Sequence, residues 1–120
     1  MPPTVRAILA SSDLDRLRGF YTALFGATEV MRFPDEGPTF YVGLRLGDSE
    51  LGVSADESVV PGTPGRMLLS IEVPDVDVLL PKVETLGGET TGGANDMPWG
   101  QRVAHVKDPD GNVVNLTRTL

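Results

Sequence analysis

The sequence contains a repeat, in which residues of the same kind recur 62 positions further along the chain. The repeated residues cover a helix cap, the apolar face of a helix, a helix stop and a hairpin turn. They are Asp13 and Asp75, Asp15 and Asp77, Leu17 and Leu79, Leu24 and Leu86, Gly26 and Gly88, and Asp48 and Asp110. Such a repeat predicts two copies of one supersecondary unit that bury a core together.

The first copy begins with a short apolar run and continues into a helix. Ser11, Ser12 and Asp13 supply the side-chain acceptors of a helix N-cap, and Gly26 is a typical helix stop. Between them, apolar residues at helical spacing define one face: Leu14, Leu17, Tyr21 and Leu24. Strands are predicted over residues 4–10, 28–33, 39–46 and 50–54, so the unit has the order βαβββ.

The second copy follows the same order, with two irregular features. Its helix is predicted to begin after Pro74-Asp75 and to end at Gly87-Gly88, and Pro81 in its interior predicts a kink or an early break. Residues 88–95, rich in Thr and Gly, are a poor strand candidate. The remaining strands are predicted over 67–73, 101–107 and 112–118, and the apolar helix face over Val76, Leu79, Val83 and Leu86.

These elements predict one α+β domain over residues 1–120, built of modules at about 4–54 and 66–118. The linker, residues 55–65, has no periodicity and is rich in Pro and Gly. Each module would have a sheet with one face on its helix and the other face bare. Two such faces must close around each other, or around copies from another chain, which predicts a cavity.

Composition argues against several classes of function. The net charge of −7 and the lack of a Lys or Arg cluster argue against binding to nucleic acid. The chain has no cysteine, so it has neither a disulfide framework nor a thiolate metal site. No apolar run approaches the roughly 20 residues of a membrane helix, and the amino-terminal residues lack an apolar signal core. We therefore expect a cytoplasmic protein that does not contact membranes.

The last hairpin is the most specific motif. Asp108-Pro109-Asp110-Gly111 combines residues that favour a tight turn, and the β-branched pair Val113-Val114 follows it. This segment closely resembles the last hairpin of the glyoxalase/bleomycin-resistance/extradiol-dioxygenase superfamily, whose fold is called vicinal oxygen chelate. Residues 12–26 resemble the first helix of that family, with its pattern DL-x-x-S-x-x-FY-x-x-LG, and residues 72–77 extend the likeness. The resemblance implies two βαβββ modules that form a curved mixed sheet around a central cleft.

The resemblance also identifies the four positions at which metal-dependent relatives place His, Glu or Gln ligands. Three of them are Arg6, Leu68 and Asn115, and the fourth is Gly52 or, on the strict 62-residue repeat, Val53. None of these residues is a good ligand for Zn, Ni or Fe, which prefer imidazole or carboxylate. We therefore expect no metal and no cofactor.

The only histidine, His105, lies on a predicted strand and has two interpretations. The repeat places an apolar set on the dry, helix-facing side: Val42, Leu44, Ala104 and Val106. The residues that alternate with this set would point into the cavity, so that His105, Tyr41 and Arg45 lie beside Arg6, Leu68, Ser70 and Asn115. There His105 is either a hydrogen-bonded structural residue or a general base.

Trp99 lies in a loop between Pro98 and Gly100. This loop resembles the WGQR loop of bleomycin- and mitomycin-binding members. The indole either offers a flat face to a planar ligand or covers the edge of the core.

Four more residues are candidates for the cavity wall. Arg102 is either a positioning group or a solvated strand residue. Phe33 and Phe40 could line the cavity, although core packing is the preferred prediction for Phe40. Arg6, a cation at an inward position, needs a partner, which is either a carboxylate such as Glu72 or a polar group of a ligand.

Together these features predict a metal-independent protein that sequesters a planar, antibiotic-like small molecule, as bleomycin-resistance-type members do. The resemblance further implies a homodimer with two clefts. The alternative is a metal-free lyase or isomerase that uses Arg6, His105 or Tyr41, and a structural or regulatory module is a third class. The predicted ligand-binding residues are Trp99, Arg6, Tyr41, His105, Asn115, Phe33, Arg102 and Leu68, with no metal ligand and no assigned catalytic residue.

Overall fold

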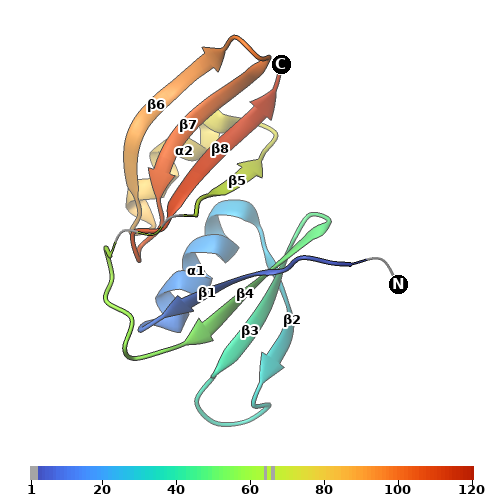
Figure 1. Cartoon of the computed structure of the whole chain (residues 1–120), viewed down its shortest axis with the longest axis vertical. Coiled ribbons are helices and arrows are strands. Elements are labelled where there is room, and N and C mark those ends of the chain that lie inside the picture. The colour runs from blue at the N-terminus through green and yellow to red at the C-terminus, as the bar shows by residue number, and fades with distance from the viewer. Residues whose placement is uncertain (1–2, 64, 66) are drawn as a thin grey trace. The chain divides into compact units, whose positions relative to one another are not determined.

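A computed structural model describes residues 3–63, 65 and 67–120. The chain divides into two compact units, Met1–Val60 and Pro61–Leu120, and each is described by itself. Both have the predicted order βαβββ (Figure 1). Two positions of the predicted boundary between the modules, Pro64 in the linker and Arg66 at the start of the second module, lie outside the described residues.

The first unit is a four-stranded mixed sheet with one helix. Its elements are β1 (Ala7–Ser11), α1 (Leu14–Phe25), β2 (Thr28–Phe33), β3 (Tyr41–Leu46) and β4 (Ser49–Ala55). The strand order is β1-β4-β3-β2, in which β1 runs parallel to β4 and the other neighbours are antiparallel. The chain between the parallel strands β1 and β4 runs through α1, β2 and β3, which gives the long connection that a parallel pair requires.

Local chemistry explains where α1 begins and ends. The Asp13 carboxylate accepts a hydrogen bond from the backbone N–H of Arg16 at 3.1 Å, which caps the first turn. The helix ends at Gly26, whose φ of 68° is left-handed and suits glycine. All four predicted apolar positions are buried, together with Phe20, which stacks edge-on against Tyr21.

The second unit repeats this architecture. Its elements are β5 (Leu69–Glu72), α2 (Val76–Thr85), β6 (Glu89–Met97), β7 (Gln101–Lys107) and β8 (Val113–Thr119). The strand order β5-β8-β7-β6, with β5 parallel to β8, matches that of the first unit. The predicted α+β class and module order are confirmed.

The structure bears on the two irregular features predicted for the second unit. An early break at Pro81 does not occur, because α2 continues through this residue to Thr85. The alternative, a kink at Pro81, stays a prediction. The poor strand candidate over 88–95 does form a strand, because β6 runs from Glu89 to Met97. Its register shifts around Gly92, and such bulges explain why no regular alternation is visible in its sequence.

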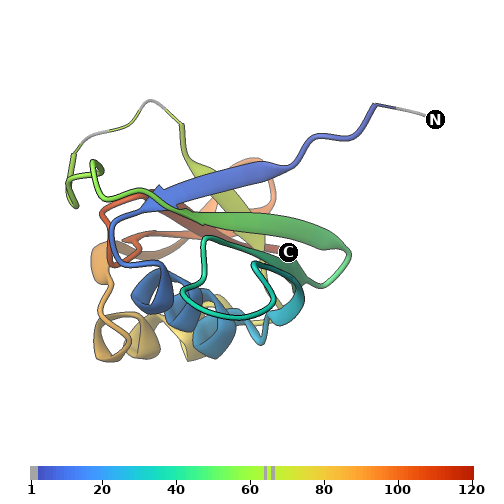
Figure 2. The ribbon, with the colours of Figure 1, turned by 90° about the horizontal axis from the view of Figure 1, so that it is seen from below.

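In each unit the helix covers one face of its own sheet (Figures 1 and 2). Val42, Leu44, Ala104 and Val106 are fully buried, as predicted for the helix-facing side. Residues that alternate with these along the strands lie on the other side, which we call the helix-free face of that unit. No helix within the described residues is long and apolar enough to span a membrane.

Candidate functional site

The turn between β7 and β8 is organised by one buried carboxylate. Asp108 accepts hydrogen bonds from the backbone N–H groups of Asp110 at 3.0 Å and Asn112 at 2.9 Å. Its second oxygen accepts from the side-chain amide of Asn112 at 2.8 Å. Gly111 completes the turn with a φ of 87°. This turn sets the register in which His105 lies opposite Asn115.

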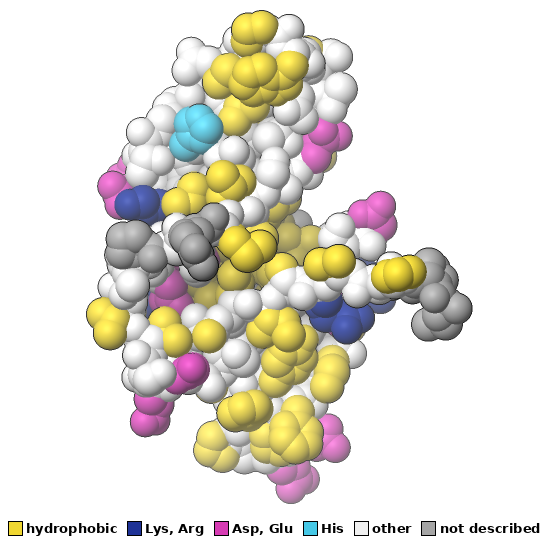
Figure 3. Space-filling model, in the orientation of Figure 1, with side chains coloured by type: hydrophobic (Ala, Val, Ile, Leu, Met, Phe, Trp, Pro, Cys, Tyr) yellow, Lys and Arg dark blue, Asp and Glu magenta, His cyan; other side chains and the backbone are white. Residues whose placement is uncertain are grey.

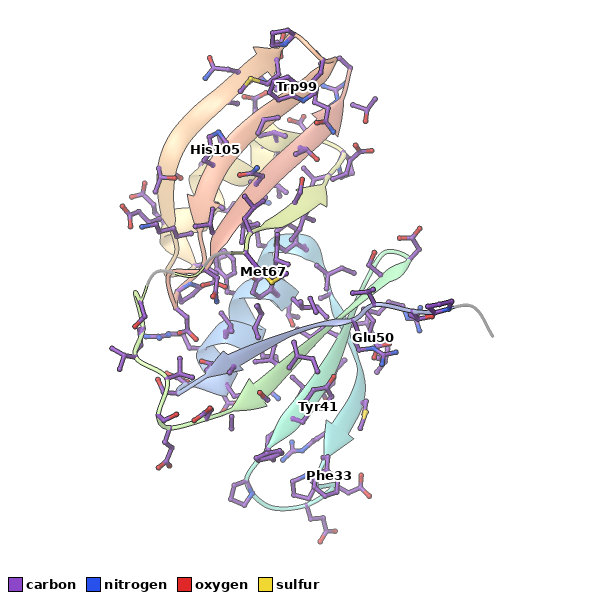
Figure 4. All side chains as sticks on the ribbon, in the orientation of Figure 1. Phe33, Tyr41, Glu50, Met67, Trp99 and His105 are labelled. Carbon is purple, nitrogen blue, oxygen red and sulfur yellow. The ribbon has the colours of Figure 1, made fainter. Side chains whose placement is uncertain are left out.

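His105 and Asn115 form a hydrogen-bonded pair on the helix-free face of the second unit. The distance from His105 Nδ1 to Asn115 Oδ1 is 2.7 Å. The imidazole is exposed and appears at the surface in Figure 3, and its place on β7 is labelled in Figure 4. The pair therefore offers a polar group to a ligand while the neighbouring apolar positions face the helix.

Trp99 lies in the β6–β7 turn, at one end of the same sheet (Figure 4). The indole is 67% exposed, so it does not act as a cover over the core. Its Nε1–H donates to Gln101 Oε1 at 3.0 Å, which holds the ring in place. Gln101 and His105 share one face of β7 and are separated by four residues, or about 13 Å. A ligand that contacts both Trp99 and His105 must therefore be extended along the strand.

Arg102 points to the opposite side of the sheet, toward α2. Its guanidinium makes two hydrogen bonds to Asp77, at 2.8 and 2.9 Å, and one to Asp96 at 2.9 Å. These hydrogen bonds raise the pKa of Arg102 and lower that of Asp77. The predicted contact between Arg102 and a ligand stays a prediction. We leave Arg102 out of the site because its guanidinium already donates to Asp77 on α2 and Asp96 on β6.

In the first unit, Arg6 pairs with a carboxylate, which is one of the two predicted kinds of partner, but this carboxylate is not Glu72. Arg6 forms an ion pair with Glu50 at 3.0 Å, whereas Glu72 accepts a hydrogen bond from the Thr119 hydroxyl at 2.6 Å. The parallel register explains the choice, since Ala7 lies opposite Leu51 and the preceding residues, Arg6 and Glu50, are neighbours.

Tyr41 lies across a glycine on the helix-free face of the first unit. A Cβ added to Gly52 would lie 2.8 Å from the Cζ of Tyr41, so the ring occupies the space that any larger residue would fill. Phe33 is the cross-strand partner of Tyr41 and is 60% exposed (Figure 4). Phe40 is 58% exposed and not in the core, so the preferred prediction for it was wrong.

The positions of the metal ligands in the family do not fit a divalent ion here. Strand pairing places Gly52 opposite Ile8 and Asn115 opposite Ser70, which makes Gly52, not Val53, the counterpart of Asn115. None of the four positions supplies a carboxylate or imidazole ligand. They hold the Arg6 guanidinium, Gly52, the exposed Leu68 and the Asn115 amide, which is hydrogen-bonded to His105. Nor do the described residues contain a group of three or more His, Cys, Asp or Glu side chains that could hold a metal.

The predicted site residues thus fall into two groups, one in each unit. Arg6, Phe33 and Tyr41 belong to the first unit, and Trp99, His105, Asn115 and Leu68 to the second. Sequence reasoning missed Glu50, Gln101 and Gly92. For Gln101, the available signal was its place in the loop that contains Trp99; for Gly92, it was a glycine within a strand, which often marks a close approach.

A groove of about 420 Å³ lies elsewhere in the second unit. It is lined by Pro61, Gly62, Gly87, Gly88, Glu89, Lys107, Asp108, Pro109 and Gly111. The backbone N–H of Gly62 donates to the Asp110 carbonyl at 2.7 Å, and Asp108 is engaged in the turn. Because neither His105 nor Trp99 lines this groove, we do not place the site there.

The sequence matches one family model over residues 4–116, described as the Glyoxalase/Bleomycin resistance protein/Dioxygenase superfamily. A curated relative, "Putative glyoxylase CFP32" of Mycobacterium tuberculosis, is 29% identical over 92% of this chain. The match covers 41% of that protein, so the chain spans about two fifths of its length.

Solved structures share the fold. A glyoxalase/bleomycin resistance protein/dioxygenase family enzyme from Burkholderia phytofirmans superposes with a TM-score of 0.79 and 23% identity, over 96% of this chain and 97% of the other. The bleomycin resistance determinant encoded on transposon Tn5 superposes with a TM-score of 0.70 and 22% identity, over 98% of each chain.

Proposed function

Because the chain belongs to the glyoxalase/bleomycin resistance protein/dioxygenase superfamily, we propose that it is a metal-independent binding protein for a planar, antibiotic-like small molecule. It holds this ligand without changing it chemically. The observation that carries the proposal is the set of residues at the metal-ligand positions of the family, Arg6, Gly52, Leu68 and Asn115. Two of them are already engaged, Arg6 by Glu50 and Asn115 by His105.

The second unit carries the residues suited to such a ligand. Trp99 presents an indole that is 67% exposed and is held by Gln101. Exposed aromatic rings that are fixed in place favour stacking on planar molecules. His105 and Asn115 supply polar groups on the same sheet. The bleomycin resistance determinant of Tn5 has the same fold, and the ligand class proposed here is taken by analogy with its name.

The proposal includes a homodimer in the cytoplasm. Its basis is the exposed apolar surface on the helix-free face of the first unit, where Ile8 is 57%, Met31 51% and Phe33 60% exposed. Exposed apolar side chains on one face of a sheet are commonly covered by a partner. The proposal includes neither membrane binding nor nucleic-acid binding. The net charge of −7 argues against binding to a phosphate backbone.

A thermal-shift experiment tests binding and metal independence together. The probes are bleomycin, a panel of planar natural products, and Zn²⁺, Ni²⁺, Mn²⁺ and Fe²⁺ with and without EDTA. A bound organic ligand at about 100 times its Kd should add about 2.7 kcal/mol of stability. Metals and chelator should leave the Tm unchanged. Stoichiometric metal retained through purification, or a metal-dependent Tm, would overturn the proposal.

A second candidate function is a metal-free lyase or isomerase. The hydrogen bond that His105 donates to Asn115 orients an exposed imidazole, as a general base requires. Tyr41 and Arg6 are the other residues that this alternative would use. Turnover separates the two functions. A binding protein returns the bound compound unchanged on denaturation, whereas an enzyme yields a product of different mass or connectivity, detectable by mass spectrometry and NMR.

A further inference from the structure

The contact between Asn115 and His105 defines which imidazole nitrogen carries the proton. Asn115 presents its carbonyl oxygen, Oδ1, to His105 Nδ1 at 2.7 Å. A carbonyl oxygen is only an acceptor, so Nδ1 must be the donor. In the neutral ring the other nitrogen, Nε2, is then an unprotonated acceptor.

The orientation of the ring determines where Nε2 points. Nδ1 faces β8, where Asn115 lies, and the opposite edge, Cδ2, faces β6. A Cβ added to Gly92 would lie 3.1 Å from Cδ2 and 3.5 Å from the Cβ of His105, so the ring rests against this glycine. With Nδ1 and Cδ2 both held against neighbouring strands, the far edge of the ring, which contains Nε2, is directed away from the sheet. His105 is an exposed residue, which agrees with this orientation.

We propose that the helix-free face of the second unit selects ligands that present an N–H or O–H donor to His105 Nε2. This inference rests on the proposed function and names its ligand class: planar heteroaromatic molecules with a ring N–H or a phenolic or enolic O–H. A molecule of the same shape that offers only an acceptor at this point places two lone pairs against each other. Both groups then lose their hydrogen bonds to water without replacement.

The tautomer is tested in the free protein, without any ligand. His105 is the only histidine in the chain, so ¹⁵N-histidine labelling gives a single imidazole pattern in long-range ¹H–¹⁵N spectra. At a pH at which the ring is neutral, the wild-type pattern should be that of the Nδ1–H tautomer. The Nε2–H tautomer in the wild-type protein would overturn the inference.

Two variants separate the role of Asn115 from general effects of losing an amide. Asn115→Leu removes the acceptor and should shift the tautomer equilibrium toward Nε2–H. Asn95→Leu is the matched control, because Asn95 is an exposed asparagine on β6 whose side chain donates to the Gly93 carbonyl. The control should keep the wild-type pattern. A tautomer that does not respond to Asn115→Leu would overturn the inference.

Ligand selectivity is tested with a pair of bicyclic compounds of nearly equal shape. Indole carries a ring N–H, and benzofuran has an oxygen without a proton at the same position. Titration monitored at the His105 nitrogens should show indole binding about tenfold or more tightly than benzofuran, and Asn115→Leu should abolish most of that preference.

The outcomes distinguish this inference from the function on which it rests. Equal affinity for indole and benzofuran, with planar natural products still bound, would overturn the donor selection and leave the binding function intact. If neither compound binds at millimolar concentration and the panel of natural products also fails, the proposed function is overturned, and the inference with it.

Discussion

At the scale of single residues, two strand glycines leave room for rings to lie against the sheets. Gly52 lies beneath Tyr41 in the first unit, and Gly92 lies beside the His105 imidazole in the second. Neither glycine has a positive φ, so the small side chain, not the backbone conformation, is what each position requires. The sequence shows both glycines but does not show which ring each accommodates.

Gly52→Ala should destabilise the protein through a clash with Tyr41. The added Cβ would lie 2.8 Å from the tyrosine Cζ, closer than real Cβ contacts allow. Overpacking of this kind costs about 1–3 kcal/mol, measurable by urea denaturation. Gly93→Ala is the matched control, because Gly93 is also a strand glycine without positive φ and has no atom within 4 Å of an added Cβ.

The double variant Gly52→Ala/Tyr41→Ala tests the cause of this loss. Removal of the ring should relieve the clash, so the two changes should be less costly together than the sum of the single variants. Simple additivity would mean that Gly52 is needed for another reason.

Trp99→Ala should weaken binding of a planar ligand and change stability little. A stacked aromatic anchor contributes roughly 1 to 4 kcal/mol to binding. Trp99 is 67% exposed, so the loss of stability should be far below the roughly 3–5 kcal/mol that is typical of a core aromatic residue. Trp99 is the only tryptophan, and its fluorescence should respond to the ligand.

Phe40→Ala is the control for Trp99→Ala, since Phe40 is a similarly exposed aromatic, at 58%, in the first unit. It should leave binding unchanged. A Trp99→Ala protein that binds normally but melts at a much lower temperature would show that the indole has a structural role instead.

At the scale of elements, Arg102 connects the sheet of the second unit to the first turn of α2. Its partner Asp77 lies two residues after the helix cap, Asp75. A carboxylate in the first turn also interacts favourably with the helix dipole. The link therefore holds β7 and the beginning of α2 together through charge, in addition to the apolar contacts beneath the helix.

This link predicts how stability responds to acid. Hydrogen bonds from Arg102 hold the pKa of Asp77 below its ordinary value of 3.8. A depressed folded-state pKa contributes stability that is fully present above that ordinary value and is lost as the pH falls through the folded-state pKa. When the pH falls below about 3.8, the free energy of unfolding should therefore decrease less in Asp77→Asn than in the wild-type protein. Denaturation at several pH values measures this difference.

Asp35→Asn provides the charge-matched control for this experiment. Asp35 is exposed in the loop between β2 and β3, so its substitution changes the net charge equally without touching the Arg102 link. If the two variants show the same acid response, net charge and not the link accounts for the effect.

At the scale of the whole molecule, the exposed apolar face of the first unit predicts a homodimer. Light scattering should give twice the chain mass of 12.8 kDa at micromolar concentration. Ile8→Glu should shift the protein toward the monomer, because Ile8 is 57% exposed and lies on the helix-free face opposite Gly52.

Val78→Glu is the control for this substitution. It introduces the same charge at an exposed apolar residue, 55% accessible, on α2 instead of a helix-free face. A monomer mass for the wild-type protein would contradict the prediction. A dimer that tolerates Ile8→Glu but not Val78→Glu would place the interface on the helix side.

The sequence by itself was enough to determine the duplicated βαβββ order, the two helix caps and the apolar face of α1. In α2, Val76 and Val83 are buried as predicted, whereas Leu79 and Leu86 are only half-buried. Asp13 and Asp75 both cap helices as predicted, and the α1 face is buried. These features depend on residues close together in the chain, where side-chain capping and a regular apolar period act directly on the local backbone. For the same reason the Asp108 turn and its likeness to a known family were visible.

Only the tertiary structure determined how strands pair and which side chains meet. The pairing of Arg6 with Glu50, the Asn115 contact of His105, and the choice of Gly52 over Val53 all follow from strand register. Register joins residues that are far apart in the chain, and bulges such as those around Gly92 change it without a clear local signal. A shift of one residue moves a side chain to the other face, which is why the periodic pattern could not assign these partners.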